Sequence, residues 1–223
     1  MVEIKICGIN DLAAMDAALA AGADLVGLVF FPPSPRNVSL DQGAKLAARA
    51  RGKARVVALT VDADDDLLDG IAKNAAPDMF QLHGSESPAR VSELRERVGR
   101  PMIKAIPVAA AEDLDAVAPY AAVADRILFD ARPPKDATRP GGHGRAFDWT
   151  LLARVSRTKP MMLSGGLNPA NVAEAVRVVR PDAVDVSSGV EKSPGVKDAT
   201  KIAAFVANAR AAAAALKSPE RVP

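Results

Sequence analysis

The feature that most restricts the fold of this chain is its alternation of short apolar runs with alanine-rich amphipathic segments. Short runs rich in Val, Ile and Leu are typical of buried strands, and the segments between them follow the period of a helix. Strands that alternate with helices build βαβ units around a parallel sheet. The pattern therefore predicts an α/β protein.

Eight strands and eight helices are predicted along the 223 residues. The strands are expected at 2–7, 24–30, 55–61, 78–82, 102–106, 126–129, 160–163 and 183–186, and the helices at 11–21, 40–51, 65–74, 88–98, 110–120, 148–156, 169–179 and 197–216. Eight strand–helix units within a chain of this length favour a single (β/α)8 TIM barrel over residues 1–216, followed by a polar tail at 217–223. An open doubly wound sheet is the alternative, although no Gly-x-Gly-x-x-Gly turn follows the first strand.

Composition excludes several classes of function. A net charge of +2 gives no basic excess for nucleic acid or an anionic membrane, and no apolar run approaches the roughly 18 residues of a membrane span. The chain has no signal-like segment, and its single cysteine fits a reducing cytoplasm. The two histidines lack zinc-site spacing, so we expect no metal, and no apolar stripe demands a partner subunit, so we expect a monomer.

In a barrel of this kind, the active site is expected at the carboxyl-terminal ends of the strands. Cys7 ends the first strand and is followed by Gly8, which lets a ligand approach closely. The thiol is a candidate base or nucleophile, with a small buried hydrophobe as the alternative. Asp130 ends the apolar sixth strand, where a carboxylate is costly unless it is paired or functional, so it is a candidate acid–base group.

Other strand ends and strands carry groups that can bind or react. Arg36 follows three prolines in a stiff loop, and its guanidinium suits a carboxylate or phosphate unless it is only a surface charge. His83 shares a strand face with Gln81, and a catalytic and a structural role are both open. Lys5 and Lys104 could form a Schiff base, but they precede their strand ends, where paired structural lysines are expected.

Glycine-rich turns follow the seventh and eighth strands and predict a phosphate site. Backbone N–H groups in such turns bind a phosphate without a lysine. The candidate ligands are Gly165, Gly166, Ser188 and Gly189. Asp185 lies on the strand face that leads to them, and it is expected to bind substrate together with Arg36 and His83. A long connection at 131–147 contains three closely spaced glycines, Gly141, Gly142 and Gly144, and is expected to be a lid rather than a solvated insertion.

Helix starts are predicted from capping residues. Ser39 precedes the second helix, and Ser85 or Ser87 precedes the fourth. Asn168 followed by Pro169 is expected to begin the seventh helix, and Asn10 to cap the first.

These residues together resemble the phosphoribosylanthranilate isomerase family of tryptophan biosynthesis. The matching motifs run in order from Lys5 to Glu191: Lys5-Ile6-Cys7-Gly8-Ile9, Ser34-Pro35-Arg36, Gln81-Leu82-His83-Gly84, Asp130, the glycine-rich loop before Phe147-Asp148-Trp149, Ser164-Gly165-Gly166-Leu167, and Asp185 through Glu191. The resemblance implies a cofactor-free Amadori rearrangement of N-(5-phosphoribosyl)anthranilate to 1-(2-carboxyphenylamino)-1-deoxyribulose 5-phosphate.

The resemblance also implies residue roles. Cys7 would be the general base, Asp130 the general acid and Arg36 the group that holds the anthranilate carboxylate, with the phosphate on the two glycine turns. The chemistry needs a neutral carboxylic acid, which burial under a lid favours, and a thiolate. We therefore expect the site, with Lys5 as one contributor, to lower the pKa of Cys7. His143 departs from the small hydroxyl residue usual in the glycine-rich loop.

Three alternatives remain. A phosphosugar isomerase of the histidine-biosynthesis type would carry an acidic residue in place of Cys7. A non-catalytic barrel would bind a phosphorylated ligand without turnover, and a Schiff-base aldolase would react through Lys5 or Lys104. Cys7 and Arg36 favour the anthranilate substrate.

Overall fold

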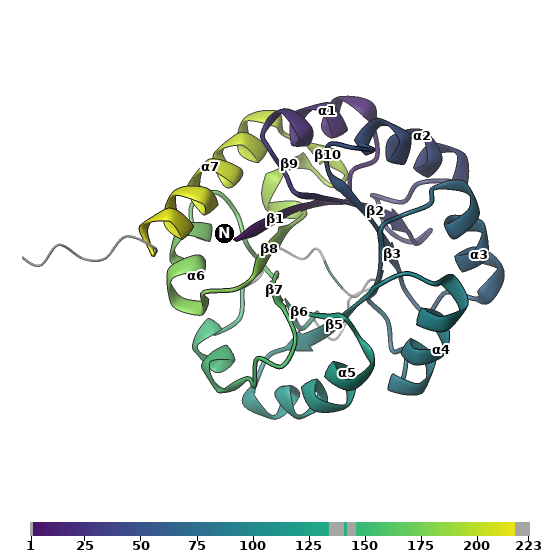
Figure 1. The fold of residues 1–223 in the computed structure, drawn as a ribbon. Helices are drawn as coiled ribbons and strands as arrows, with labels where there is room; N and C mark the ends of the chain where they lie inside the picture. Colours follow the sequence, from purple (N-terminus) through teal and green to yellow (C-terminus); the bar gives the residue numbers. More distant parts are fainter. Residues whose placement is uncertain (1, 134–140, 142–145, 217–223) are drawn as a thin grey trace, which may run out of the picture.

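Eight parallel strands close into a barrel in the computed structural model, which describes residues 2–133, 141 and 146–216 (Figure 1). The strands follow one another around the barrel in sequence order, and β1 pairs with β8 to close it. Their bounds are β1 Glu3–Cys7, β2 Leu25–Phe30, β3 Arg55–Thr60, β4 Met79–Leu82, β5 Met102–Val108, β6 Arg126–Ala131, β7 Met161–Leu163 and β8 Ala183–Val186. The predicted (β/α)8 barrel is confirmed, while the predicted tail at 217–223 lies outside the described residues.

Helices surround the barrel (Figure 1). They are α1 Leu12–Ala20, α2 Leu40–Ala50, α3 Asp65–Asn74, α4 Pro88–Val98, α5 Val117–Val123, α6 Val172–Val179 and α7 Ala199–Ala215, with 3-10 helices η1 Ala111–Ala116, η2 Trp149–Arg154 and η3 Ser188–Val190. The helix predicted at 110–120 is replaced by η1 and α5, and the one predicted at 148–156 is η2. The Asp113 carboxylate accepts hydrogen bonds from the backbone of Ala109 and Ala110, which holds η1 in a tight turn.

Capping explains most helix starts. Ser39 and Ser87 cap α2 and α4, which confirms those predictions. Asn10 does not cap α1, because the Asp11 carboxylate accepts from the backbone of Ala14 instead. The Asn168 amide oxygen accepts from the backbone of Ala170 and forms a separate turn, so α6 begins later than predicted.

Side chains along each strand point alternately to the core between the sheet and the helices and to the interior of the barrel. On β1, Ile4 and Ile6 pack outward in the core shared with the helices, while Lys5 and Cys7 occupy the other strand face. The lower interior is apolar and is filled by side chains from β2 through β8, namely Leu25, Val57, Met79, Ile103, Ala105, Leu128, Met162 and Ala183. The barrel is therefore a packed core, and polar side chains gather above this layer.

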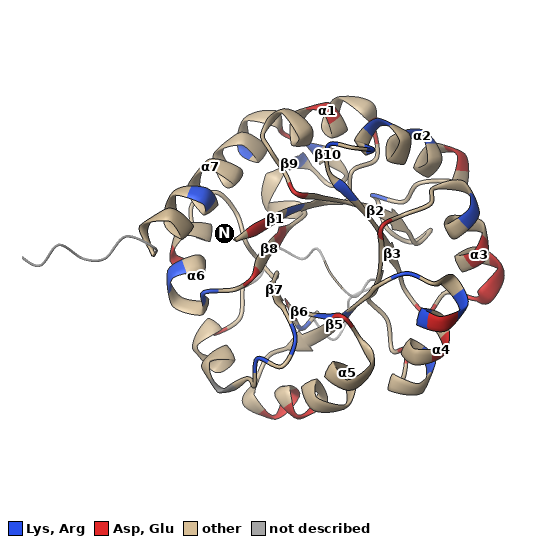
Figure 2. Ribbon diagram, in the orientation of Figure 1, with Lys and Arg blue, Asp and Glu red and all other residues tan. Residues whose placement is uncertain are grey.

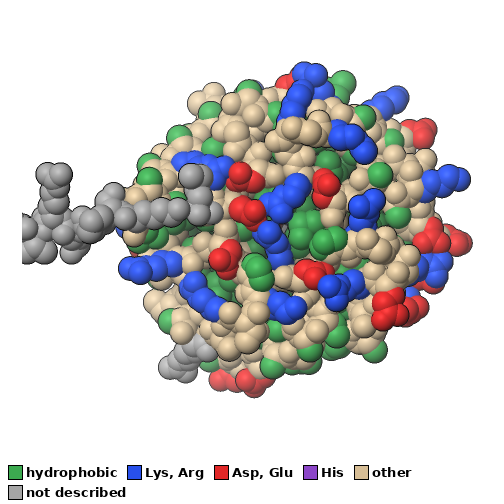
Figure 3. Space-filling view, viewed as in Figure 1, with side chains coloured by type: hydrophobic (Ala, Val, Ile, Leu, Met, Phe, Trp, Pro, Cys, Tyr) green, Lys and Arg blue, Asp and Glu red, His purple; other side chains and the backbone are tan. Residues whose placement is uncertain are grey.

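Charged residues are interspersed over the outer helices, and they also occur within β1 and β8 of the barrel wall (Figure 2). At the amino-terminal end of the barrel, Glu3 forms ion pairs with Arg55 and Arg126 from the starts of β3 and β6. The face in front in Figure 3 accordingly shows acidic and basic side chains side by side. Among the described helices, none is long and apolar enough to cross a bilayer.

A two-stranded antiparallel hairpin, which the sequence did not predict, lies between β8 and α7. It consists of β9 Glu191–Ser193 and β10 Val196–Lys197. The turn uses Gly195 at φ +83°, a conformation that favours glycine, and the carbonyl of Gly195 accepts from the side chain of Asn10 at 3.0 Å. The hairpin is therefore tied to the loop that follows β1.

Candidate active site

A cavity of about 830 Å³, part of it open to solvent, lies at the carboxyl-terminal mouth of the barrel. Most of the predicted site residues line it: Cys7, Arg36, His83, Asp130, Gly141, Gly165, Gly166, Asp185 and Ser188. Gly189 lies beside the cavity without lining it, and Gly142 and Gly144 lie outside the described residues. Residues from strand ends far apart in the sequence thus share one cavity.

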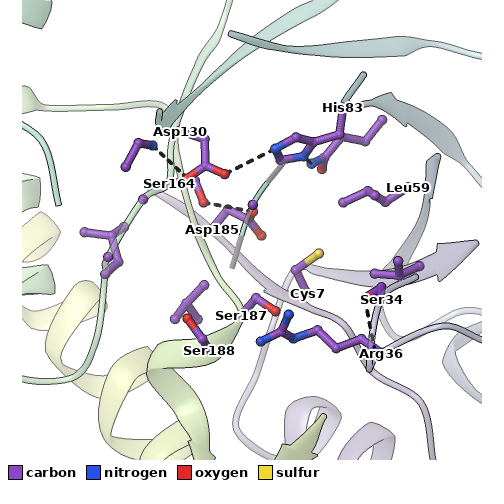
Figure 4. A pocket seen from close by; sticks show the side chains of 18 of the residues that line it. Cys7, Ser34, Arg36, Leu59, His83, Asp130, Ser164, Asp185, Ser187 and Ser188 are labelled. Carbon is purple, nitrogen blue, oxygen red and sulfur yellow. Dashed lines mark hydrogen bonds and ion pairs between the residues drawn. The ribbon is translucent and has the colours of Figure 1, made fainter. Parts of the chain in front are cut away.

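Cys7 ends β1 with its side chain directed into the cavity (Figure 4). The residue is only 4% exposed and packs over β2 at Gly27, where an added Cβ would lie 2.7 Å from the sulfur. Burial raises the pKa of the Cys7 thiol; Asp185 adds to the rise, and the charges of Lys5 and Lys197 oppose it. The expectation that the site lowers this pKa is therefore wrong. Desolvation prevails because each lysine is itself paired with a carboxylate.

Asp130 ends the buried part of β6 on another side of the cavity (Figure 4). One carboxylate oxygen, Oδ1, accepts from the backbone N–H of Ala131 at 2.8 Å, and Oδ2 lies 3.2 Å from Nε2 of His83. Two glycines crowd this carboxylate: a Cβ at Gly141 or Gly165 would lie 2.9 or 3.1 Å from its oxygens. Asp130 is therefore held by two contacts while remaining on the cavity wall.

A chain of polar contacts crosses the barrel beneath the mouth. Lys5 is fully buried, and its amine lies 3.0 Å from Oδ1 of Asp185 and 2.7 Å from Oε1 of Gln81. The amide nitrogen of Gln81, Nε2, lies 3.0 Å from Nδ1 of His83. Burial alone would lower the pKa of Lys5, but the charge of Asp185 leads the interactions that leave it raised.

Lys104 is also buried and paired. Its amine contacts the Glu86 carboxylate at 2.8 Å and the carbonyl of Gly84 at 2.6 Å. Both lysines that could have formed a Schiff base are therefore bound to carboxylates, the arrangement expected of structural lysines.

Arg36 is 4% exposed and reaches the cavity over the end of β1. Only a glycine fits beneath it, because a Cβ at Gly8 would lie 2.4 Å from the Cδ of Arg36. Its Nε and Nη2 donate to the two carboxylate oxygens of Glu191 at 2.7 and 2.8 Å. Among the described residues, these contacts leave the Nη1 hydrogens for another acceptor.

Glu191 and Lys197 were missed as site residues by sequence reasoning. The Lys197 amine donates to Glu191 at 2.8 Å and to the carbonyl of Ser187 at 3.0 Å. Burial alone would raise the pKa of Glu191, but hydrogen bonds and charges from Arg36 and Lys197 leave it lowered. In the sequence, Glu191 is the last residue of the motif that begins at Asp185. A charged residue close to a glycine turn was the one sign that it could belong to the site.

The two glycine turns after β7 and β8 touch each other. Gly165 and Gly166 adopt φ values of +81° and +66°, which favour glycine. A Cβ at Gly189 would lie 1.9 Å from the carbonyl oxygen of Leu167, so the turns approach as closely as backbone allows. Within the described part of the chain, the N–H groups of Gly165 and Gly166 have no hydrogen-bond acceptor. They can receive an anion.

Across residues 2–133, 141 and 146–216, no cluster of three or more His, Cys, Asp or Glu side chains could hold a metal ion. The mouth thus offers a thiol, a carboxylate, a guanidinium and bare backbone donors.

Comparison with known proteins matches residues 4–208 to the family described as N-(5'-phosphoribosyl)anthranilate (PRA) isomerase. An N-(5'-phosphoribosyl)anthranilate isomerase of Rhodopseudomonas palustris (strain BisA53) is 60% identical over 210 residues, covering 94% of this chain and 96% of that protein. One from Afipia carboxidovorans is 58% identical over 219 residues, covering 98% and 92%.

Solved structures give the same similarity. The crystal structure of phosphoribosyl anthranilate isomerase from Thermotoga maritima has a TM-score of 0.86 and 37% identity, covering 95% of this chain and all of that one. A phosphoribosyl anthranilate isomerase in complex with reduced 1-(o-carboxyphenylamino)-1-deoxyribulose 5-phosphate has a TM-score of 0.81 and 34% identity, with the same coverage.

Proposed function

Because the chain belongs to the N-(5'-phosphoribosyl)anthranilate isomerase family, an enzyme family of tryptophan biosynthesis, we propose that it catalyses the Amadori rearrangement of N-(5-phosphoribosyl)anthranilate, with Cys7 as general base and Asp130 as general acid. One observation supports these roles above all: the thiol and the carboxylate line a single cavity that also contains both glycine turns. The product is 1-(2-carboxyphenylamino)-1-deoxyribulose 5-phosphate.

In the first step, Asp130 donates its proton to the ribose ring oxygen. The bond between C1 and that oxygen breaks, and the nitrogen lone pair forms a C1=N double bond, which gives a protonated imine. Hydrogen bonds from His83 and the backbone of Ala131 then stabilise the carboxylate that Asp130 becomes. The ring-opened substrate remains bound through its carboxylate at one end and its phosphate at the other.

In the second step, the Cys7 thiolate removes the proton from C2. The C2–H electrons form a C1=C2 double bond, and the C=N electrons return to nitrogen, which gives an enolamine. The enolamine tautomerises by losing the hydroxyl proton at C2 and gaining one at C1. Protons move without net oxidation, so the rearrangement requires no redox cofactor.

Binding follows from the remaining groups. Arg36 holds the anthranilate carboxylate through its Nη1 edge, while Glu191 fixes the plane of the guanidinium. The phosphate binds to the N–H groups of Gly165 and Gly166 and to the turn at Ser188, and Gly189 keeps the two turns together. We propose that the protein is cytoplasmic and monomeric. Analytical ultracentrifugation would measure its mass in solution and so test the oligomeric state.

The test is turnover of N-(5-phosphoribosyl)anthranilate by the purified chain, followed by the loss of anthranilate fluorescence. Cys7→Ser and Asp130→Asn should each lower kcat by roughly 10²- to 10⁴-fold, the usual contribution of a positioned acid or base. Both variants should still bind a reduced product analogue. A wild-type chain that binds this analogue without turnover would instead be a binding barrel, and turnover of a histidine-biosynthesis aminoaldose alone would identify the other isomerase.

A further inference from the structure

Gln81 is a fully buried amide whose two polar atoms contact two different side chains. Its Oε1 lies 2.7 Å from the amine of Lys5 on β1, and its Nε2 lies 3.0 Å from Nδ1 of His83, just beyond β4. The far side of the imidazole, Nε2, lies 3.2 Å from the Asp130 carboxylate. Figure 4 shows His83 and Asp130 directed toward each other.

Hydrogen-bond chemistry permits only one orientation of this amide. A lysine ammonium donates and cannot accept, so the oxygen of Gln81 must face Lys5. The NH2 group of Gln81 therefore faces Nδ1 of His83, which must accept. The raised pKa of Lys5 beside Asp185 keeps the ammonium protonated, so the argument holds at neutral pH.

We infer that Gln81 is a positioning residue that fixes His83 in the neutral tautomer with its proton on Nε2 and directs that proton at Asp130. All hydrogen bonds in the chain then run in one direction, from Lys5 through Gln81 and His83 to Asp130. The opposite tautomer would place the N–H of His83 against the NH2 group of Gln81, two donors face to face.

The consequence for catalysis rests on the proposed function. The only bare nitrogen of His83 faces Gln81, so the imidazole has no lone pair with which to take the proton of Asp130. His83 instead donates to Asp130, which stabilises the carboxylate formed when the proton goes to the substrate. The sequence left catalytic and structural roles open for His83, and this geometry makes it a donor that orients the acid.

Nuclear magnetic resonance of protein labelled with ¹⁵N-histidine tests the tautomer directly. The chain has only two histidines, so His143→Asn assigns the signals of both. We expect His83 to show a bare Nδ1 and a protonated Nε2 at neutral pH. A proton on Nδ1 in the wild-type chain, or an equal mixture of tautomers, would overturn the inference without any activity measurement.

The matched variants are Gln81→Glu and Gln81→Met. The carboxylate of the first accepts from both Lys5 and His83, so Nδ1 should gain a proton, whereas the second should leave the tautomer unspecified. Each should lower kcat by about 10- to 100-fold, the range found when a partner that orients a metal-binding imidazole is removed, with KM nearly unchanged. Signals of His83 unchanged in both folded variants would contradict the role of Gln81.

Activity separates this inference from the proposed function. A wild-type chain with the expected tautomer but no isomerase turnover would disprove the function and leave the tautomer assignment standing. An active chain whose kcat is unaffected while the tautomer changes in Gln81→Glu would disprove the positioning role. Circular dichroism of each variant establishes that the fold is retained.

Discussion

Arg36 and Glu191 form a buried two-point ion pair across 155 positions of sequence, with N–O distances of 2.7 and 2.8 Å. Arg36 comes from the loop after β2, and Glu191 begins the hairpin after β8. Because both guanidinium contacts lie on one edge, the pair fixes the plane of the group and the direction of its other edge. Lys197 contacts the same carboxylate, so one acidic residue compensates two buried cations.

We predict that Glu191→Gln both destabilises the protein and weakens carboxylate recognition. The amide leaves two buried cations without a counter-charge, which should lower the free energy of unfolding by roughly 3–5 kcal/mol. KM for the carboxylate-bearing substrate should rise as the guanidinium loses its fixed plane. Urea unfolding and steady-state kinetics measure these effects. Asp16→Asn is the control: its pair with Arg49 is half exposed, so no measurable change is expected. Equal effects of the two variants would contradict the prediction.

The pH dependence of kcat/KM should report on Cys7. Burial, with a smaller contribution from Asp185, raises the pKa of the thiol, so little of it is thiolate at neutral pH in the free enzyme. The thiolate fraction grows as pH rises toward that pKa, and kcat/KM should therefore increase from neutral into alkaline solution. This rising limb should be absent in Cys7→Ser. A wild-type profile that falls over the same interval would exclude a buried thiol as the base.

Stability at alkaline pH should depend on Lys5. Burial alone would lower the pKa of Lys5, but the interactions with Asp185 and Cys7 together outweigh desolvation and raise it in the folded chain above the value of 10.5 for an unperturbed lysine. Its contribution to stability is thus full below pH 10.5 and is lost as pH rises through the folded-state value. Urea unfolding across this interval should show the decline in wild type. In the double variant Lys5→Met with Asp185→Asn the decline should be smaller, and an identical slope in both proteins would refute the linkage.

Gly189→Ala should disturb the two glycine turns together. The new Cβ would lie 1.9 Å from the carbonyl oxygen of Leu167, and backbone cannot move aside as a flexible side chain does. We expect a loss of about 1–3 kcal/mol in unfolding free energy and weaker binding of phosphorylated ligands. Gly70→Ala on α3 is the control, because its Cβ meets only the flexible end of Leu40 and alanine favours a helix. Calorimetric titration with a reduced product analogue measures binding, and unchanged affinity would contradict the coupling of the turns.

Much of the site was predictable because a parallel barrel brings the strand ends to one mouth. Cys7 and Asp130 needed only their positions at the ends of β1 and β6, and Gln81 and His83 needed only the two-residue period of a strand. The roles of these residues in the reaction remain predictions.

Contacts made by side chains distant in sequence were not predictable. Nothing in the sequence near Arg36 indicates Glu191, because their pairing depends on a hairpin whose strands are short. The prediction that the pKa of Cys7 is lowered was wrong for a related reason. The direction of this shift depends on burial and on whether the neighbouring lysines already have counter-charges. Asn10 and Asp11 were equally good caps by type, and only the backbone geometry selected Asp11.

Pairing of β1 with β8 places Lys5 opposite Asp185, which joins the two ends of the barrel wall. During synthesis, Cys7 leaves the ribosome long before Asp185, Glu191 and Lys197. Contacts between partners so distant in the sequence have a high contact order, which slows folding. We therefore expect the thiol of a nascent chain to have Lys5 close to it but to lack the charges of Asp185 and Lys197 until the carboxyl-terminal part of the chain has folded.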